Sequence, residues 1–136
     1  MEAIVNWKAG LSFEGTASGH TVAIDTTVAG GGNDTGMSPK QMLLASVCGC
    51  SGMDVVEILR KMRVQFTQLQ IKAEAEQTDT HPKVFKYIKM TYRADIKEDD
   101  IESLSKAINL SHEKYCGVSA MLKKHCDISH SIELIK

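Results

Sequence analysis

The chain has 136 residues, of which 43% are hydrophobic, enough to bury the core of one α+β domain over residues 1–136. Its 16 basic and 17 acidic residues give a net charge of -1 without a basic block, which argues against nucleic acid or a membrane as a partner. Met1–Glu2–Ala3 leads directly into a strand pattern without a signal peptide, so we expect the four cysteines to be reduced thiols in the cytoplasm.

The beginning of the chain predicts an antiparallel meander of three short strands. Apolar and polar residues alternate through residues 3–24, and Ser18–Gly19 marks a turn. The glycine-rich stretch 29–36 is then expected to be a loop that leads into a helix. A nucleotide site in this loop is disfavoured, because no Gly-Lys-Ser/Thr follows it.

The longest apolar stretch, residues 41–53, contains no charge and predicts a central helix that is buried on all sides. The start of this helix is well marked, because Ser38 can serve as N-cap, Pro39 fits the first helical position and Gln41 completes a capping box. If the helix runs to Met62, its length is about 37 Å, the width of a small domain. The uncharged run of 13 residues is shorter than the roughly 20 that cross a bilayer, which favours a core helix.

The rest of the chain predicts two more strands, two shorter helices and a final strand. These elements are strands at 69–75 and 88–96 around a turn at His81–Pro82, helices at 101–108 and 118–124, and a strand at 128–134. With the meander and the central helix, this order predicts an α+β fold.

A single chain does not offer enough neighbouring elements to bury the central helix. A helix from Ser38 to Met62 that is apolar on every side needs neighbours all round, and one chain offers only a meander, a hairpin and short pieces. A second copy of the chain would supply them, and the small residues between Ala45 and Gly52 suit a close two-fold crossing. The sequence therefore predicts a homodimer. The same small residues could also leave space beside a reactive sulfur.

Cys50 and Cys116 are the candidate reactive pair. On a helix that turns ~100° per residue, Cys48 and Cys50 point about 160° apart and cannot bridge each other. Cys116 lies at the expected start of a helix, where the positive end of the dipole favours a thiolate. Asp54, one turn after Cys50, would oppose a thiolate there unless it is itself paired. Buried cysteine is a common core residue, so the residues alone leave open both a redox pair and two structural thiols.

Metal binding is the weaker interpretation of the cysteines and histidines. The side chains that could form a ligand set are Cys48, Cys50 and Cys116 with His112 or His125. Residues two apart on a helix face away from each other, and the chain has no Cys-x-x-Cys, so we expect no metal and no cofactor. We expect Cys126 and His130 to be structural. His112 either tunes Cys116 or belongs to a solvated helix end.

The segment Ser38–Ala45 followed by Cys50, together with the later run Tyr115–Ser119, resembles the osmotically inducible protein C / organic hydroperoxide resistance (OsmC-like) superfamily. In that family a Ser-Pro or Asn-Pro step opens the central helix, and the peroxide-reacting cysteine stands eleven residues after the proline, as Cys50 does here. The second cysteine of the family precedes a Val-Ser step at a helix start and corresponds to Cys116. The resemblance covers essentially the whole chain and implies an OsmC-like fold. It also implies that two chains form an intertwined homodimer with two sites at the interface.

The resemblance also implies thiol-dependent reduction of organic hydroperoxides. Cys50 would attack the peroxide oxygen and become a sulfenic acid, and Cys116 would resolve it as a disulfide. A dithiol from outside the chain would then reset the pair. An apolar wall from Leu43, Val47 and Met53 would favour an alkyl hydroperoxide over hydrogen peroxide.

Two positions depart from the family pattern. Family members with peroxidase activity use an arginine from the N-terminal strands and a glutamate just after the helix-opening proline. Here no arginine precedes Arg60, and Lys40 follows Pro39. Either another cation does this work (Lys8, Lys40 or one from the partner chain), or the activity is altered. A second interpretation therefore stays open, a non-enzymatic module of the same dimeric fold that binds a small apolar or thiol-containing ligand beside Cys50.

Overall fold

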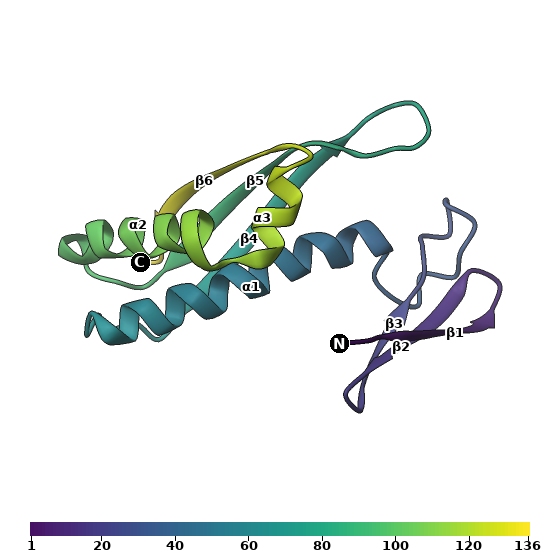
Figure 1. Ribbon diagram of the computed structural model, residues 1–136, viewed down its shortest axis with the longest axis horizontal. Helices are drawn as coiled ribbons and strands as arrows, with labels where there is room; N and C mark the ends of the chain where they lie inside the picture. The colour runs from purple at the N-terminus through teal and green to yellow at the C-terminus, as the bar shows by residue number, and fades with distance from the viewer. The chain divides into compact units, whose positions relative to one another are not determined.

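The computed structural model describes all 136 residues, which form two compact units, residues 1–43 and 44–136. The elements in chain order are β1 (Ile4–Ala9), β2 (Ser12–Ala17), β3 (His20–Ile24), α1 (Pro39–Lys61), β4 (Leu69–Gln77), β5 (Phe85–Ala94), α2 (Ile101–Leu110), α3 (Gly117–Lys123) and β6 (Asp127–Leu134) (Figure 1). A 3₁₀ turn, Glu98–Asp100, precedes α2, and a π-helical turn, Ser111–Tyr115, follows it. The predicted α+β order is confirmed.

The first unit contains the antiparallel sheet β1-β2-β3, as the alternating pattern predicted. Its register pairs Val5 with Gly15 and Gly15 with Val22, so the apolar side chains of the three strands share one face of the sheet. Much of this face remains open to solvent, and the side chain of Trp7 is 65% exposed. An apolar sheet face of this kind needs further cover.

The glycine-rich loop after β3 is built around Asp25, whose side chain is buried. The Asp25 carboxylate accepts hydrogen bonds from the backbone N–H groups of Thr26, Asn33 and Thr35 at 2.7–3.2 Å. It also accepts one from the Thr35 hydroxyl at 2.6 Å, which is the largest cause that holds the pKa of Asp25 below its ordinary value. The loop thus has a fixed conformation that leads into α1.

The start of α1 confirms the predicted capping box. The backbone N–H of Ser38 donates to Oε1 of Gln41 at 3.0 Å, and the N–H of Gln41 donates to Oγ of Ser38 at 3.3 Å. Four residues spaced four apart form the buried stripe of the helix, namely Val47, Ser51, Val55 and Leu59. Other faces are uncovered within the chain, and the side chain of Met53 is 77% exposed. One chain therefore covers only one stripe of its central helix.

By length and composition alone, α1 could cross a membrane. Its contacts argue for a core helix instead, because Ser51 and Asp54 in its middle both hydrogen-bond to Ser111 of the π-helical turn. A membrane-spanning helix would have to expose these polar groups to lipid.

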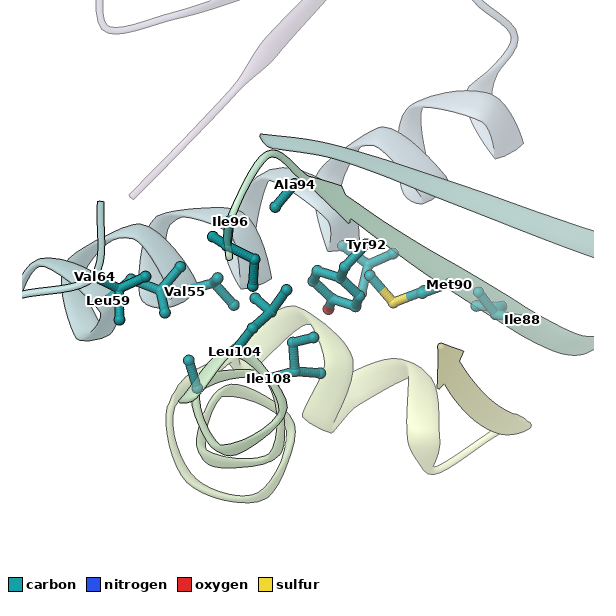
Figure 2. Close-up of a cluster of buried hydrophobic side chains, with 12 residues drawn as sticks. Val55, Leu59, Val64, Ile88, Met90, Tyr92, Ala94, Ile96, Leu104 and Ile108 are labelled. Carbon is teal, nitrogen blue, oxygen red and sulfur yellow. The ribbon is translucent and has the colours of Figure 1, made fainter. Parts of the chain in front are cut away.

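The second unit packs α1 and α2 against one face of the sheet β4-β5-β6 (Figure 2). The central strand β5 runs antiparallel to β4 and parallel to β6. Alternate residues of β5 point into the core and meet side chains of both helices, the set being Ile88, Met90, Tyr92 and Ala94 with Val55, Leu59, Leu104 and Ile108. Since parallel strands need a crossover, the chain from β5 to β6 passes through α2, the π-helical turn and α3. This crossover brings Cys116 back to α1.

Candidate functional site

Two cysteines that are 66 residues apart in sequence meet between α1 and the crossover. Cys50 lies in the middle of α1 and is partly exposed, whereas Cys116 precedes α3 and is 3% exposed. Cys116 lies near enough to Cys50 for an interaction between the two thiols to help raise the pKa of Cys116, and both thiols are free. The structure therefore brings together the two residues that the sequence selected as a reactive pair.

Cys116 is the N-cap residue of α3. Its sulfur accepts a hydrogen bond from the backbone N–H of Ser119 at 3.3 Å, and the Ser119 hydroxyl donates to the Cys116 carbonyl at 3.2 Å. We expected this helix start to favour a thiolate, but burial, followed by the interaction with Cys50, raises the pKa of Cys116 above that of an ordinary thiol. The expectation is wrong for the reduced protein, because desolvation of the buried thiol outweighs the hydrogen bond from the N–H of Ser119 at the helix start, which lowers the pKa.

The other two cysteines lie elsewhere. Cys48 lines a shallow apolar groove of about 530 Å³ along α1, together with Gly49, Gly52, Met53, Val56, Leu69 and Ile71. Cys126 packs against the core of the second unit next to β6. Burial raises the pKa of both thiols. Cys48 and Cys50 thus occupy different sides of the helix, in agreement with their predicted separation.

The three residues expected to form an apolar wall on the Cys50 side of α1 do not form one. Val47 is fully buried in the core, Met53 lines the groove of Cys48, and Leu43 is largely exposed. Ideal helix geometry gives the angle between side chains, but packing against β5 decides which of them are buried. The wall assignment was therefore wrong for Val47 and Met53.

A chain of buried polar side chains runs beside the two cysteines. The hydroxyl groups of Ser51 and Tyr92 lie 2.6 Å apart, and the Tyr92 hydroxyl lies 2.8 Å from Nε2 of His112. Oγ of Ser111 lies 2.9 Å from Oγ of Ser51 and 2.9 Å from Oδ2 of Asp54. Ser51, Tyr92 and Ser111 are fully buried. Burial raises the pKa of Tyr92 above its usual range, so this hydroxyl keeps its proton.

This network was not predicted from the sequence, although two signals pointed to it. Ser51 interrupts an apolar stripe of α1, and Tyr92 stands on the apolar face of a strand, where a buried hydroxyl needs a partner. Asp54 accepts a hydrogen bond from the hydroxyl of Ser111, so its partner is a neutral group and not a cation. His112 is buried and bonded to Tyr92, so it does not belong to a solvated helix end, and its influence on Cys116 stays a prediction.

His112 is held as a neutral imidazole. Its ring stacks on that of His130 with centroids 5.3 Å apart, and its backbone carbonyl accepts a hydrogen bond from Nζ of Lys123. Burial, then the nearby His130 and Lys123, lowers the pKa of His112 to about 4. Burial also lowers the pKa of His130.

Acid should destabilise the protein through His112. The unfolded chain takes up a proton near pH 6.5 and the folded chain only near pH 4, so stability should be full above pH 6.5 and fall as the pH drops from 6.5 to 4. The expected loss is on the order of 3 kcal/mol. Urea unfolding at several pH values should show this slope, and His112→Gln should flatten it. The exposed His20, the first residue of β3, changed to glutamine, serves as control; an equal flattening by His20→Gln would contradict the assignment.

No group of three or more His, Cys, Asp or Glu side chains is arranged to hold a metal ion. Nε2 of His112 is occupied by its bond to Tyr92. Lys8 and Lys40, the suggested substitutes for the family arginine, belong to the first unit, whereas the cysteines belong to the second. A role for either cation stays a prediction.

Comparisons with known proteins agree with the fold. Residues 31–131, which include both Cys50 and Cys116, match the model of a family described as OsmC-like protein. Protein YhfA of Escherichia coli is 36% identical over 136 residues, which cover 99% of this chain and 98% of that protein.

Two solved structures show the same fold over nearly the full chain. A hypothetical protein from Aquifex aeolicus is 28% identical with a TM-score of 0.81, over 99% of this chain and 97% of that one. The organic hydroperoxide resistance protein OsmC from Legionella pneumophila is 17% identical with a TM-score of 0.70, over 98% of this chain and 97% of that one. The second likeness is one of fold alone.

Proposed function

The chain belongs to the OsmC-like protein family, and from this premise we propose that it is a thiol-dependent peroxidase that reduces organic hydroperoxides through Cys50 and Cys116. The family supports a role in peroxide or redox stress response, and the Legionella neighbour is an organic hydroperoxide resistance protein. The observation that carries the proposal is the proximity of the two thiols, one partly exposed and one buried.

The proposed reaction has three steps. The thiolate of Cys50 attacks one oxygen of the peroxide, so that an S–O bond forms, the O–O bond breaks and the alkoxide leaves as an alcohol after taking a proton. The sulfur of Cys116 then attacks the sulfenic acid; the S–S bond forms, and hydroxide leaves with the thiol proton as water. An external dithiol exchanges with the disulfide, becomes oxidised itself and restores both thiols.

The difference in burial between Cys50 and Cys116 supports the two proposed roles. Substrate can reach Cys50, which is partly exposed, while Cys116 is nearly inaccessible from solvent. The raised pKa of Cys116 keeps it protonated in the resting state, so that it does not compete with Cys50 for the peroxide. A buried thiol near the attacking sulfur is well placed to resolve the sulfenic acid before it is oxidised further.

Consumption of an alkyl hydroperoxide with dithiothreitol as reductant tests this function. We expect continuous turnover, with slower turnover of hydrogen peroxide. The absence of any consumption would reject the peroxidase. It would favour the second candidate, a binding module on the same fold. Two departures from the family pattern support this candidate: no arginine precedes Arg60, and Lys40 stands where the family has a glutamate.

We also propose that the protein is a homodimer in the cytoplasm, where its four free thiols would stay reduced. The apolar face around Trp7, the exposed Met53 and the apolar groove beside Cys48 are surfaces that a single chain leaves uncovered. A side chain added at Gly49 would meet no atom of the same chain within 4 Å, so a partner helix could approach α1 there.

Light scattering at low concentration should give twice the chain mass of 14.9 kDa. Gly49→Leu should weaken the dimer, because overpacking a close contact costs about 1–3 kcal/mol. Gly117→Leu is the matched control, since an added side chain there also meets no atom within 4 Å and lies away from the groove. A folded single chain of 14.9 kDa that unfolds cooperatively would contradict the dimer.

A further inference from the structure

We propose that the buried chain of hydrogen bonds from Asp54 to His112 is a positioning network that holds Cys50 and Cys116 at the separation needed for disulfide formation. The inference deepens the proposed two-cysteine function and rests on it. None of these polar residues is needed to form or break a bond in the steps above. Their burial beside the two thiols nevertheless asks for an explanation, because burying polar groups is costly unless each is satisfied.

The network is attached to both segments that carry the cysteines. Ser51 follows Cys50 directly on α1. The carbonyl of Ser111 accepts a hydrogen bond from the backbone N–H of Cys116 at 2.7 Å. The bond of 2.9 Å between the hydroxyl groups of Ser51 and Ser111 therefore joins α1 to the π-helical turn. Ser51 is the residue next to Cys50, and Ser111 is bonded directly to the backbone of Cys116.

Each hydroxyl group of the network has two partners. Oγ of Ser111 donates toward both Oδ2 of Asp54 and Oγ of Ser51. The Tyr92 hydroxyl shares hydrogen bonds with Oγ of Ser51 at 2.6 Å and with Nε2 of His112 at 2.8 Å. Removing one hydroxyl would leave buried partners unsatisfied on both sides of the gap.

The network also fixes the shape of the turn before Cys116. A π-helical turn is uncommon and needs support from its surroundings, and such turns are frequent at functional sites. Ser111 at its start is bound to α1, and His112 is bound to Tyr92 of β5. Nζ of Lys123, on α3, donates to the carbonyl of His112. Contacts with three elements thus hold the turn that delivers Cys116.

The property that this network should control is the effective concentration of one thiol at the other. Equilibrium with oxidised dithiothreitol measures it without any peroxide. In that exchange Cys50 and Cys116 lose two electrons and two protons and form a disulfide, while the cyclic disulfide of the reagent becomes a dithiol. The fraction of linked protein at each reagent ratio gives the effective concentration.

Tyr92→Phe removes the central hydroxyl and keeps the ring in the core. We expect it to lower the effective concentration about tenfold or more, because small misplacements of reacting groups have effects of this size. Ser111→Ala, which breaks the network next to α1, should do the same. Tyr87→Phe is the matched control: Tyr87 lies on the same strand, is exposed and bonds to Glu76. It should leave the value unchanged.

Ile108→Val separates positioning from mere loss of stability, since it weakens the same core without touching a hydroxyl. It should leave the effective concentration as in the wild type. The inference is overturned if Tyr92→Phe and Ser111→Ala stay within twofold of the wild type, if Ile108→Val lowers the value equally, or if the wild type forms no Cys50–Cys116 disulfide. If Tyr92→Phe does not fold, Ser111→Ala decides. A wild type that links under oxidised dithiothreitol but consumes no hydroperoxide would reject the peroxidase and leave this inference standing.

Discussion

Cys50→Ser should abolish the consumption of alkyl hydroperoxide, because it removes the only sulfur that both reaches solvent and lies near the resolving thiol. Cys116→Ser should consume one equivalent per chain and then stop as a sulfenic acid, which dimedone would trap and mass spectrometry would detect. The difference arises because attack and resolution are separate steps carried by different sulfur atoms.

Cys48→Ala is the matched control on the same helix. Cys48 lines the groove on another side of α1, so this variant should turn over at close to the wild-type rate. Hydroperoxide consumption by Cys50→Ser would contradict the assignment of the attacking residue. Loss of activity in Cys48→Ala with activity retained in Cys50→Ser would exchange the roles of the two cysteines.

Gly36→Ala should give the largest loss of stability in the first unit. A Cβ atom at Gly36 would lie 2.4 Å from the carbonyl oxygen and 2.5 Å from the carbonyl carbon of Ala23. Both are backbone atoms of β3, which pairs with β2, so the clash can be relieved only by moving the strand. We expect a loss of roughly 3 kcal/mol in the free energy of unfolding.

Trp7, the single tryptophan, lies in the same unit and reports this loss through its fluorescence during urea unfolding. Gly117→Ala is the control, because a Cβ atom added at the start of α3 meets nothing within 4 Å. It should change the free energy of unfolding by less than about 0.5 kcal/mol. Equal unfolding curves for the two variants would contradict the close approach of Gly36 to β3.

Local sequence signals were sufficient for the elements of the fold. The alternation before Ile24, the capping box at Ser38 and the apolar stripe after Ile101 each depend on neighbours along the chain, and all three predictions are confirmed. The convergence of Cys50 and Cys116 had a different origin. It followed from the spacing of family motifs, since no local pattern relates residues so far apart.

Features that depend on tertiary packing could not be predicted. The thiolate expected at Cys116 followed from its helix start, but burial against α1 reverses the direction of the shift. The wall expected from Val47 failed because the sheet, not the helix, decides which stripe is buried. The π-helical turn and the bond between Tyr92 and His112 exist only once the crossover is folded.

The most direct test of the two-cysteine function is the map of disulfides after one equivalent of alkyl hydroperoxide has been added to reduced protein. The remaining thiols are alkylated, and the peptides are identified by mass spectrometry. We predict a linked pair of peptides that contain Cys50 and Cys116, with Cys48 and Cys126 alkylated. A disulfide that contains Cys48, or four alkylated cysteines after excess hydroperoxide, would contradict the proposed function.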